Sequence, residues 1–142
     1  MDVGIGIVIR RIPDRIQTVS STKAPDLRVL ITRRKPDTVY GGYWEFPGGK
    51  MDMGEDAASC VARELREEIG IEAEVFGVLS DAMHTYPHAT VRLHPRLCRL
   101  TPDSPEPRNL HVAEHRWVRP AELAGFKFPG ANGAIVLELL EA

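Results

Sequence analysis

Residues 49–71 read G-K-M-D-M-G-E-D-A-A-S-C-V-A-R-E-L-R-E-E-I-G-I, and this stretch carries more ionisable groups in a defined order than any other part of the chain. Between Asp56 and Ile69 apolar residues recur at helical spacing, and Gly70 stands where a helix commonly ends in a left-handed residue. The apolar positions are Ala58, Val61, Ala62, Leu65 and Ile69. The pattern predicts an amphipathic helix preceded by a glycine-rich loop.

Three carboxylates gather on one side of this predicted helix. At about 100° per residue, Glu64, Glu67 and Glu68 fall within one sector, beside the apolar stripe. Like charges at these spacings destabilise a helix by about 0.2–0.5 kcal/mol per pair, and Arg63 and Arg66 offset only part of that repulsion. A hard divalent cation such as Mg²⁺, which prefers oxygen ligands, would offset the rest. The alternative is a solvated helix face with ordinary ion pairs.

The residues around the carboxylates belong to a longer pattern. W-E-F-P-G-G-K occupies residues 44–50, and the order G-x5-E-x7-R-E-U-x-E-E-x-G-U, where U is aliphatic, is matched at every position. The matching residues are Gly49, Glu55, Arg63, Glu64, Leu65, Glu67, Glu68, Gly70 and Ile71. This order resembles the Nudix box. Together with M-x-M-G-E, the segment W-E-F-P-G-G-K resembles the MutT branch of that family, the nucleotide-pool sanitising diphosphatases.

The resemblance implies the Nudix fold, an α/β architecture in which a mixed, curved β-sheet is sandwiched between α-helices, over a single domain of residues 1–142. Apolar, β-branched and alternating runs predict strands at residues 3–10, 27–32 and 73–80, a hairpin over 83–100 and a final helix at 134–140. The charged segment 11–26, which contains Pro13 and Pro25, is expected to be a loop or an extended hairpin connection.

Composition limits the partners and the compartment. The net charge of −2 gives no basic footprint for long nucleic acid, so a small anionic substrate needs a local positive site or a metal. Cys60 and Cys98 have neither metal-binding nor redox spacing and are expected to be buried thiols of a reducing compartment. No basic leader and no run of membrane-spanning length is present, so we expect a cytoplasmic protein without a membrane segment. Monomer and homodimer both remain open.

The resemblance assigns chemistry to the box. Glu67 and Glu68 are the expected ligands of Mg²⁺, for which Mn²⁺ can substitute, and the backbone carbonyl of Gly48 or Gly49 is a further candidate ligand. Glu64 is either another ligand or the base that takes the proton of the attacking water. Arg63 is expected to orient these carboxylates, and Glu55 to hold Arg63.

Three residues outside the box are expected to bind the nucleotide. The resemblance puts Arg34 near the base or the phosphates, Phe46 in the base pocket, and the Asn132 amide on the purine edge, where an amide offers both donors and an acceptor. The alternatives are a solvated strand end for Arg34, a core position for Phe46 and a turn or helix cap for Asn132.

One position departs from the family. Many relatives carry a further metal-binding or basic glutamate six residues before the tryptophan of the W-V strand, and that position is His111 here. Glu114 lies three residues before Trp117, and Glu106 lies further upstream. Either glutamate is a candidate for this role, the site working without it is the alternative, and we include Glu114 among the expected catalytic residues.

The leading hypothesis is a Mg²⁺-dependent MutT-like diphosphatase that converts an oxidised purine triphosphate such as 8-oxo-dGTP to the monophosphate and pyrophosphate. A second hypothesis is a Nudix hydrolase for another nucleotide, such as a CTP-like pyrimidine, a dinucleoside polyphosphate or a nucleotide sugar. A third is a non-catalytic lesion-recognition module similar to the C-terminal domain of MutY-type glycosylases. Hydrolysis of a triphosphate in Mg²⁺ would favour an enzyme over the third hypothesis, and nucleotide sugars and dinucleoside polyphosphates are the next substrates to test if triphosphates are inert.

Overall fold

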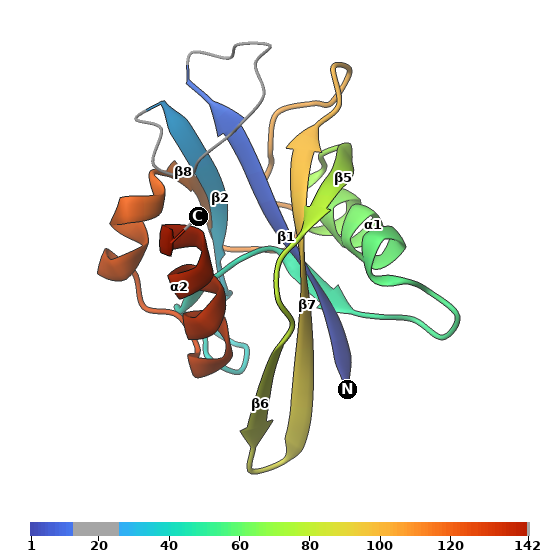
Figure 1. Ribbon diagram of the computed structural model, residues 1–142, viewed down its shortest axis with the longest axis vertical. Coiled ribbons are helices and arrows are strands. Elements are labelled where there is room, and N and C mark those ends of the chain that lie inside the picture. The colour runs from blue at the N-terminus through green and yellow to red at the C-terminus, as the bar shows by residue number, and fades with distance from the viewer. Residues whose placement is uncertain (13–25, 142) are drawn as a thin grey trace.

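The first strand of the chain is the centre of the sheet. The computed structural model describes residues 1–12 and 26–141. Within them, β1 (Asp2–Arg11) pairs antiparallel with β2 (Leu27–Arg33) on one side and parallel with β7 (Ala89–Leu100) on the other (Figure 1). The first half of β1 also pairs antiparallel with β4 (Gly48–Lys50). β1 is therefore the strand on which the glycine segment before the box helix is fixed.

The remaining strands extend the sheet on both sides of β1. β3 (Trp44–Glu45) and β8 (Glu114–Val118) pair antiparallel with β2. β5 (Ala73–Val78) and β6 (Ala82–Tyr86) pair antiparallel with β7. The described part of the chain thus forms one eight-stranded mixed sheet.

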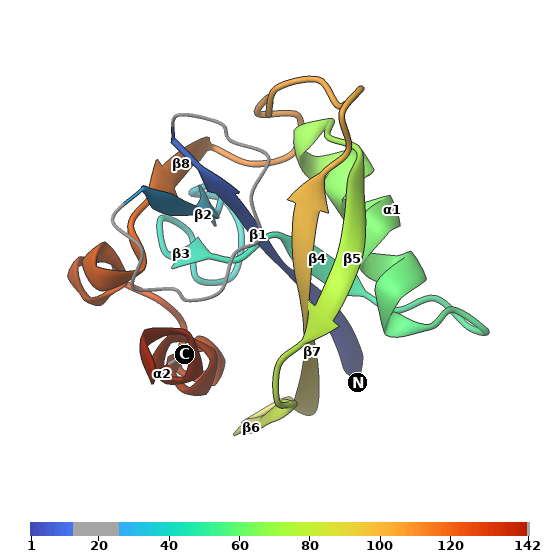
Figure 2. The ribbon, with the colours of Figure 1, turned by 45° about the horizontal axis from the view of Figure 1, so that its top comes forward.

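The helices cover opposite faces of the sheet. α1 (Ala57–Ile69) lies on one side of β1 and α2 (Gly133–Glu141) on the other, as both views show (Figures 1 and 2). Two 3-10 helices, η1 (Pro120–Gly125) and η2 (Gly130–Asn132), precede α2. The expected arrangement of a mixed sheet between helices is confirmed.

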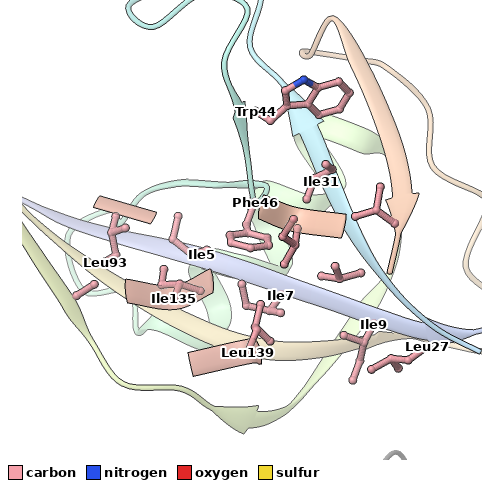
Figure 3. Close-up of a cluster of buried hydrophobic side chains, with 14 residues drawn as sticks. Ile5, Ile7, Ile9, Leu27, Ile31, Trp44, Phe46, Leu93, Ile135 and Leu139 are labelled. Atoms are coloured by element: carbon pink, nitrogen blue, oxygen red, sulfur yellow. The ribbon is translucent and has the colours of Figure 1, made fainter. Parts of the chain in front are cut away.

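Each face of the sheet has its own hydrophobic core. On the α2 side the cluster includes Ile5, Ile7, Phe46, Ile135 and Leu139 (Figure 3). On the α1 side the buried residues are Val8, Leu30, Val61, Leu65, Ile69, Ile71, Cys98 and Val112. Successive side chains of a strand point to opposite faces, which explains why Ile7 and Val8 belong to different cores.

Two glycines of β1 allow α1 to approach the sheet closely. A Cβ atom at Gly4 would lie 2.9 Å from Sγ of Cys60, and one at Gly6 would lie 3.2 Å from methyl groups of Val61 and Leu65. Larger residues would push the helix away from the strand. These glycines therefore help to fix the distance between the box helix and β1.

The predicted box helix is confirmed at both ends. The Asp56 side chain accepts a hydrogen bond from the Ser59 amide at 2.8 Å, which caps the first turn. Gly70 adopts the left-handed conformation with φ of 67° and donates to the carbonyls of Leu65 and Arg66.

The other predicted elements agree with the structure within a few residues, and the predicted hairpin turns at Pro87–His88 between β6 and β7. One difference concerns the predicted glycine-rich loop, whose first residues form β4. They do so because Gly48 and Gly49 pair with Ile5 and Gly4 of β1.

The predicted connection 11–26 lies, apart from its ends, outside the described residues. At those ends the amide of Ile12 donates to the carbonyl of Asp26 at 2.7 Å, which continues the pairing of β1 with β2. Of the helices described, none has the length and apolar character required to cross a membrane.

Candidate active site

The ionisable residues of the box lie on α1, next to β4. A Cβ atom at Gly49 would lie only 2.4 Å from Cδ of Glu64, so the glycine allows the Glu64 carboxylate to lie against the strand backbone. The amide of Gly48 donates to Oε2 of Glu68 at 3.3 Å. Strand and helix together therefore present carboxylate and backbone oxygens on one surface.

Arg63 connects most of the carboxylates of the box. Its Nε and Nη2 donate to the two oxygens of Glu55 at 2.8 and 2.9 Å, and its Nη1 donates to Glu64 at 2.9 Å and to Glu67 at 3.2 Å. Hydrogen bonds from Arg63 are the main reason that the pKa of Glu55 falls to about 2. The expected role of Glu55, which is to hold Arg63, agrees with this geometry.

Glu68 has no such cationic partner on its own helix. Its pKa is raised to about 8, mainly by burial and also by the neighbouring carboxylates of Glu45 and Glu64, while the Gly48 amide and Arg34 act in the opposite direction. Burial is also the main reason that the pKa of Glu64 is raised. The site therefore concentrates negative charge that the protein itself does not fully neutralise.

This charge surplus fits the divalent metal ion that the box implies. The available donors are carboxylate and carbonyl oxygens, the ligands that hard cations prefer, and the missing side chain of Gly49 keeps the approach to Glu64 open. In the part of the chain that the structure describes, no three Asp, Glu, His or Cys side chains are grouped closely enough to hold an ion. Glu64 and Glu67 both accept hydrogen bonds from the same Nη1 of Arg63.

Cys60 lies beneath the glycine segment. Its thiol is fully buried and donates to the carbonyl of Gly49 at 3.3 Å. Burial raises the pKa of this thiol, so it stays protonated as a donor. Both cysteines are buried, as expected from the sequence.

Arg34 is held by two neighbours. Its Nε donates to the carbonyl of Val39 at 2.7 Å, and its Nη1 donates to both oxygens of Glu45 at 3.2 and 3.0 Å. Because Arg34 lowers and Glu45 raises the pKa of Glu68, this pair lies within electrostatic range of the box. The structure thus links Arg34 to the carboxylates of α1 through Glu45.

Phe46 and Asn132 both lie at the core on the α2 side. Phe46, labelled in Figure 3, is 1% exposed. Its ring centroid is 5.4 Å from that of Phe128. Asn132 is 6% exposed, and its Nδ2 donates to the carbonyl of Pro129 at 3.5 Å. Its Oδ1 is buried without a hydrogen-bond partner among the described residues. The core alternative for Phe46 describes its present position, and Asn132 presents an unused acceptor.

Glu114 lies in a different set of contacts. It accepts from Nε of Arg116 at 2.8 Å and forms an ion pair with Arg33 at 3.4 Å, and the hydrogen bond from Arg116 is the main reason that its pKa is lowered. Within residues 1–12 and 26–141 its ion pairs are with these two arginines and not with the box. The structure therefore does not bring Glu114 into contact with Glu64, Glu67 or Glu68.

Glu106 and His111 are the other residues considered for the position of the additional family glutamate, and the structure shows the contacts of both. Glu106 accepts from Nη1 of Arg10 through both of its oxygens at 3.0 Å. The backbone amide of His111 donates to the carbonyl of Glu68 at 3.0 Å, which places this loop at the last turn of α1. The His111 side chain is exposed.

Reasoning from the sequence missed Glu45 and Cys60. Glu45 stands between Trp44 and Phe46, which are both buried, and a charged residue inside an apolar run was the available signal. Cys60 carried no comparable signal, because its contact with Gly49 depends on how α1 packs against β4.

Comparison with known proteins agrees with this geometry. A family model described as NUDIX domain matches residues 21–138. The 8-oxo-dGTP diphosphatase of Escherichia coli (strain K12) is 32% identical over 111 residues, which cover 78% of this chain and 84% of that protein. The CTP pyrophosphohydrolase of the same strain is 33% identical over 79 residues, which cover 56% of this chain and 58% of that protein.

The fold is also that of solved structures. The crystal structure of a MutT protein from Methanosarcina mazei Go1 superposes with a TM-score of 0.75 at 18% identity, over 99% of this chain and 92% of that one. At this identity the likeness concerns the fold. With the family match over residues 21–138 and the complete box on α1 and β4, the chain belongs to the NUDIX domain family and is a Nudix hydrolase.

Proposed function

We propose that this hydrolase converts 8-oxo-dGTP to 8-oxo-dGMP and pyrophosphate with the help of Mg²⁺, and so acts in nucleotide-pool sanitation. The relative from Escherichia coli that bears the name 8-oxo-dGTP diphosphatase supports this substrate. The oxygen donors of the box support a hard divalent ion. A small nucleotide also suits a chain whose net charge is −2.

The unused acceptor of Asn132 is the feature that favours 8-oxoguanine over guanine as the base. Guanine presents acceptors at N7 and O6, whereas oxidation at C8 places a hydrogen on N7 and turns that atom into a donor. A buried acceptor without a partner is costly, by about 1–3 kcal/mol, until a donor reaches it. Oδ1 of Asn132 is such an acceptor. It would accept from N7–H of the oxidised base and would find no donor at N7 of normal guanine.

The metal ion would be held by Glu67, Glu68 and the Gly49 carbonyl, with Glu64 as a further ligand or as the base. When bound, the ion screens the phosphate oxygens and lowers the pKa of a coordinated water. Glu64 is suited to accept a proton because burial raises its pKa. Arg63, which donates to both Glu64 and Glu67, keeps these carboxylates on the same side of α1.

Glu114 stays a candidate catalytic residue in this proposal. It would have to leave Arg33 and Arg116 in order to act near the box. Arg34, Phe46 and Asn132 remain the proposed nucleotide contacts.

A CTP-directed hydrolase is the second candidate. The observation in its favour is the CTP pyrophosphohydrolase relative, whose identity is similar although it covers less of this chain. A pyrimidine has no N7, so it would leave Oδ1 of Asn132 without the partner described above. The two candidates therefore differ in the role of one residue.

The decisive measurement is pyrophosphate release from 8-oxo-dGTP, dGTP and CTP, each with Mg²⁺ and with chelator. The proposal expects preferred hydrolysis of 8-oxo-dGTP that chelator abolishes. Replacement of Asn132 by alanine should reduce that preference, whereas E74Q, in an exposed ion pair on β5 and β7, should leave it unchanged. Preferred hydrolysis of CTP would favour the second candidate, and activity in chelator would contradict the role of the metal.

A further inference from the structure

One nitrogen of the Arg34 guanidinium, Nη2, makes no hydrogen bond among the described residues. Nε is occupied by the carbonyl of Val39, and Nη1 by the two oxygens of Glu45. Within residues 1–12 and 26–141, Nη2 donates to no acceptor of the protein. The Arg34 side chain is 32% exposed, and its Nε and Nη1 are both held by hydrogen bonds within the protein.

Glu45 is placed to hold that guanidinium. It belongs to β3, where it pairs with Thr32 of β2, two residues before Arg34. Its side chain is 22% exposed, and its neighbours Trp44 and Phe46 are both buried. A carboxylate in such surroundings loses hydration, and the charge-assisted hydrogen bonds from Arg34 compensate for that loss. The two residues are thus coupled: each is the main polar partner of the other.

We propose that Glu45 is a positioning residue for nucleotide binding: it orients Arg34 so that Nη2 donates to an oxygen of the substrate. This inference rests on the proposed function of the site as a nucleotide pocket. The acceptor is an anionic phosphate oxygen or a carbonyl oxygen of the base, which share the chemistry that a guanidinium recognises. Glu45 itself does not contact the substrate.

Glu45 could instead act through Glu68, a proposed metal ligand. Its carboxylate is close enough to Glu68 to disfavour the charged form of that residue. If this were its main effect on the enzyme, Glu45 would influence metal affinity and turnover rather than nucleotide affinity. The two roles therefore predict different kinetic constants.

The test is a double-mutant cycle with E45Q, R34A and the combination of both. Glutamine keeps the shape of Glu45 but removes its charge and one of its two acceptor oxygens. R34K keeps the charge of Arg34 but cannot reproduce its planar fork, and E74Q is the matched control because Glu74 pairs with Arg99 at an exposed site. Steady-state kcat and KM are measured at saturating Mg²⁺, and the unfolding transition of each variant verifies the fold.

We expect E45Q and R34K each to raise KM about tenfold, as fits the loss of a charge-assisted hydrogen bond, with kcat within about twofold of wild type. In the R34A background, E45Q should change KM by less than about twofold, because its effect passes through Arg34. E74Q should leave both constants unchanged. Independent effects of R34A and E45Q, or a fall in kcat without a rise in KM, would overturn the proposal.

Two further measurements show whether Arg34 donates to the base or to a phosphate, and they distinguish a failure of this proposal from a failure of the proposed function. Weaker binding of both 8-oxo-deoxyguanosine and 8-oxo-dGMP to E45Q would assign the acceptor to the base, and weaker binding of the nucleotide alone would assign it to a phosphate. Wild-type hydrolysis of CTP but not of 8-oxo-dGTP would refute the proposed function, and the same cycle run with CTP would still decide the role of Glu45. A wild-type protein that binds no nucleotide would refute both.

Discussion

Replacing Glu68 with glutamine should make the metal-free protein more stable, although it removes a proposed metal ligand. Glu68 is half-buried near the carboxylates of Glu45 and Glu64, and its pKa lies near 8 instead of the ordinary 4.5. The folded protein therefore binds this proton more tightly than the unfolded chain does. As a result, the contribution of Glu68 to stability falls as the pH rises from about 4.5 to about 8.

The size of the effect follows from the shift. One pH unit corresponds to about 1.36 kcal/mol, and pH 7 lies about 2.5 units above the ordinary pKa, so keeping the proton on Glu68 in the folded protein at pH 7 costs about 3 kcal/mol relative to the unfolded chain, which has released it. At pH 4.5 the same cost is only a few tenths of a kcal/mol. The advantage of E68Q over wild type should therefore be about 3 kcal/mol larger at pH 7 than at pH 4.5.

Urea unfolding in chelator at the two pH values measures this difference. Urea typically lowers stability by about 1–3 kcal/mol per molar, so the midpoint of E68Q should exceed that of wild type by at least about 1 M at pH 7. Comparing the two pH values cancels the change in packing between glutamate and glutamine. E74Q serves as the control, since its exposed ion pair with Arg99 should contribute less than about 1 kcal/mol.

Addition of Mg²⁺ gives the complementary result. An ion that binds only the folded state should stabilise wild type at pH 7, and it should stabilise E68Q much less. If E68Q were no more stable than wild type in chelator at pH 7, or if its advantage were the same at both pH values, the view of the site as an unneutralised carboxylate cluster would be refuted.

The remaining predictions concern turnover and specificity. E67Q should lose about 100-fold or more in kcat with an unchanged circular dichroism spectrum, because it removes a proposed metal ligand; wild-type activity would contradict that assignment. N132A should lower the ratio of kcat/KM for 8-oxo-dGTP over dGTP by at least about tenfold, and an unchanged ratio would exclude Asn132 from base recognition. G49A places a Cβ atom 2.4 Å from Cδ of Glu64 and should reduce kcat about 100-fold. G133A, where a Cβ atom meets no atom within 4 Å, should leave kcat unchanged, and equal activity of these two variants would refute the close approach at Gly49.

The arginine at the centre of the box partly neutralises its carboxylates. Arg63 contacts Glu55, Glu64 and Glu67, whereas the Glu68 carboxylate accepts a hydrogen bond from the Gly48 amide. A negative charge is therefore most costly at Glu68, whose pKa is raised to about 8. This is the physical reason that Glu68, rather than another glutamate, is the most sensitive reporter of the site.

The box helix was predictable because its determinants are local. Asp56 caps it three residues before Ser59, and Gly70 ends it in a left-handed conformation. Arg63 reaches Glu67 across one helical turn, a spacing that the sequence alone displays. The complete order of the box also sufficed for the family and for the arrangement of a sheet between helices.

Contacts between distant segments required the tertiary structure. Glu45 on β3 is within electrostatic range of Glu68 on α1, and Glu114 faces Arg33 because β8 pairs with β2 in a particular register. No local pattern determines which charged residues such pairings bring together.

The burial of individual side chains was equally beyond the sequence. Phe46 and Asn132 are 86 residues apart and become buried on the same face of the sheet only when η2 and α2 pack there. The sequence by itself determined the chemistry of the helix, since its hydrogen bonds and charges act within one or two turns. The tertiary structure decided which residues lose water and which arginine each carboxylate meets, because both depend on the packing of segments that are distant along the chain.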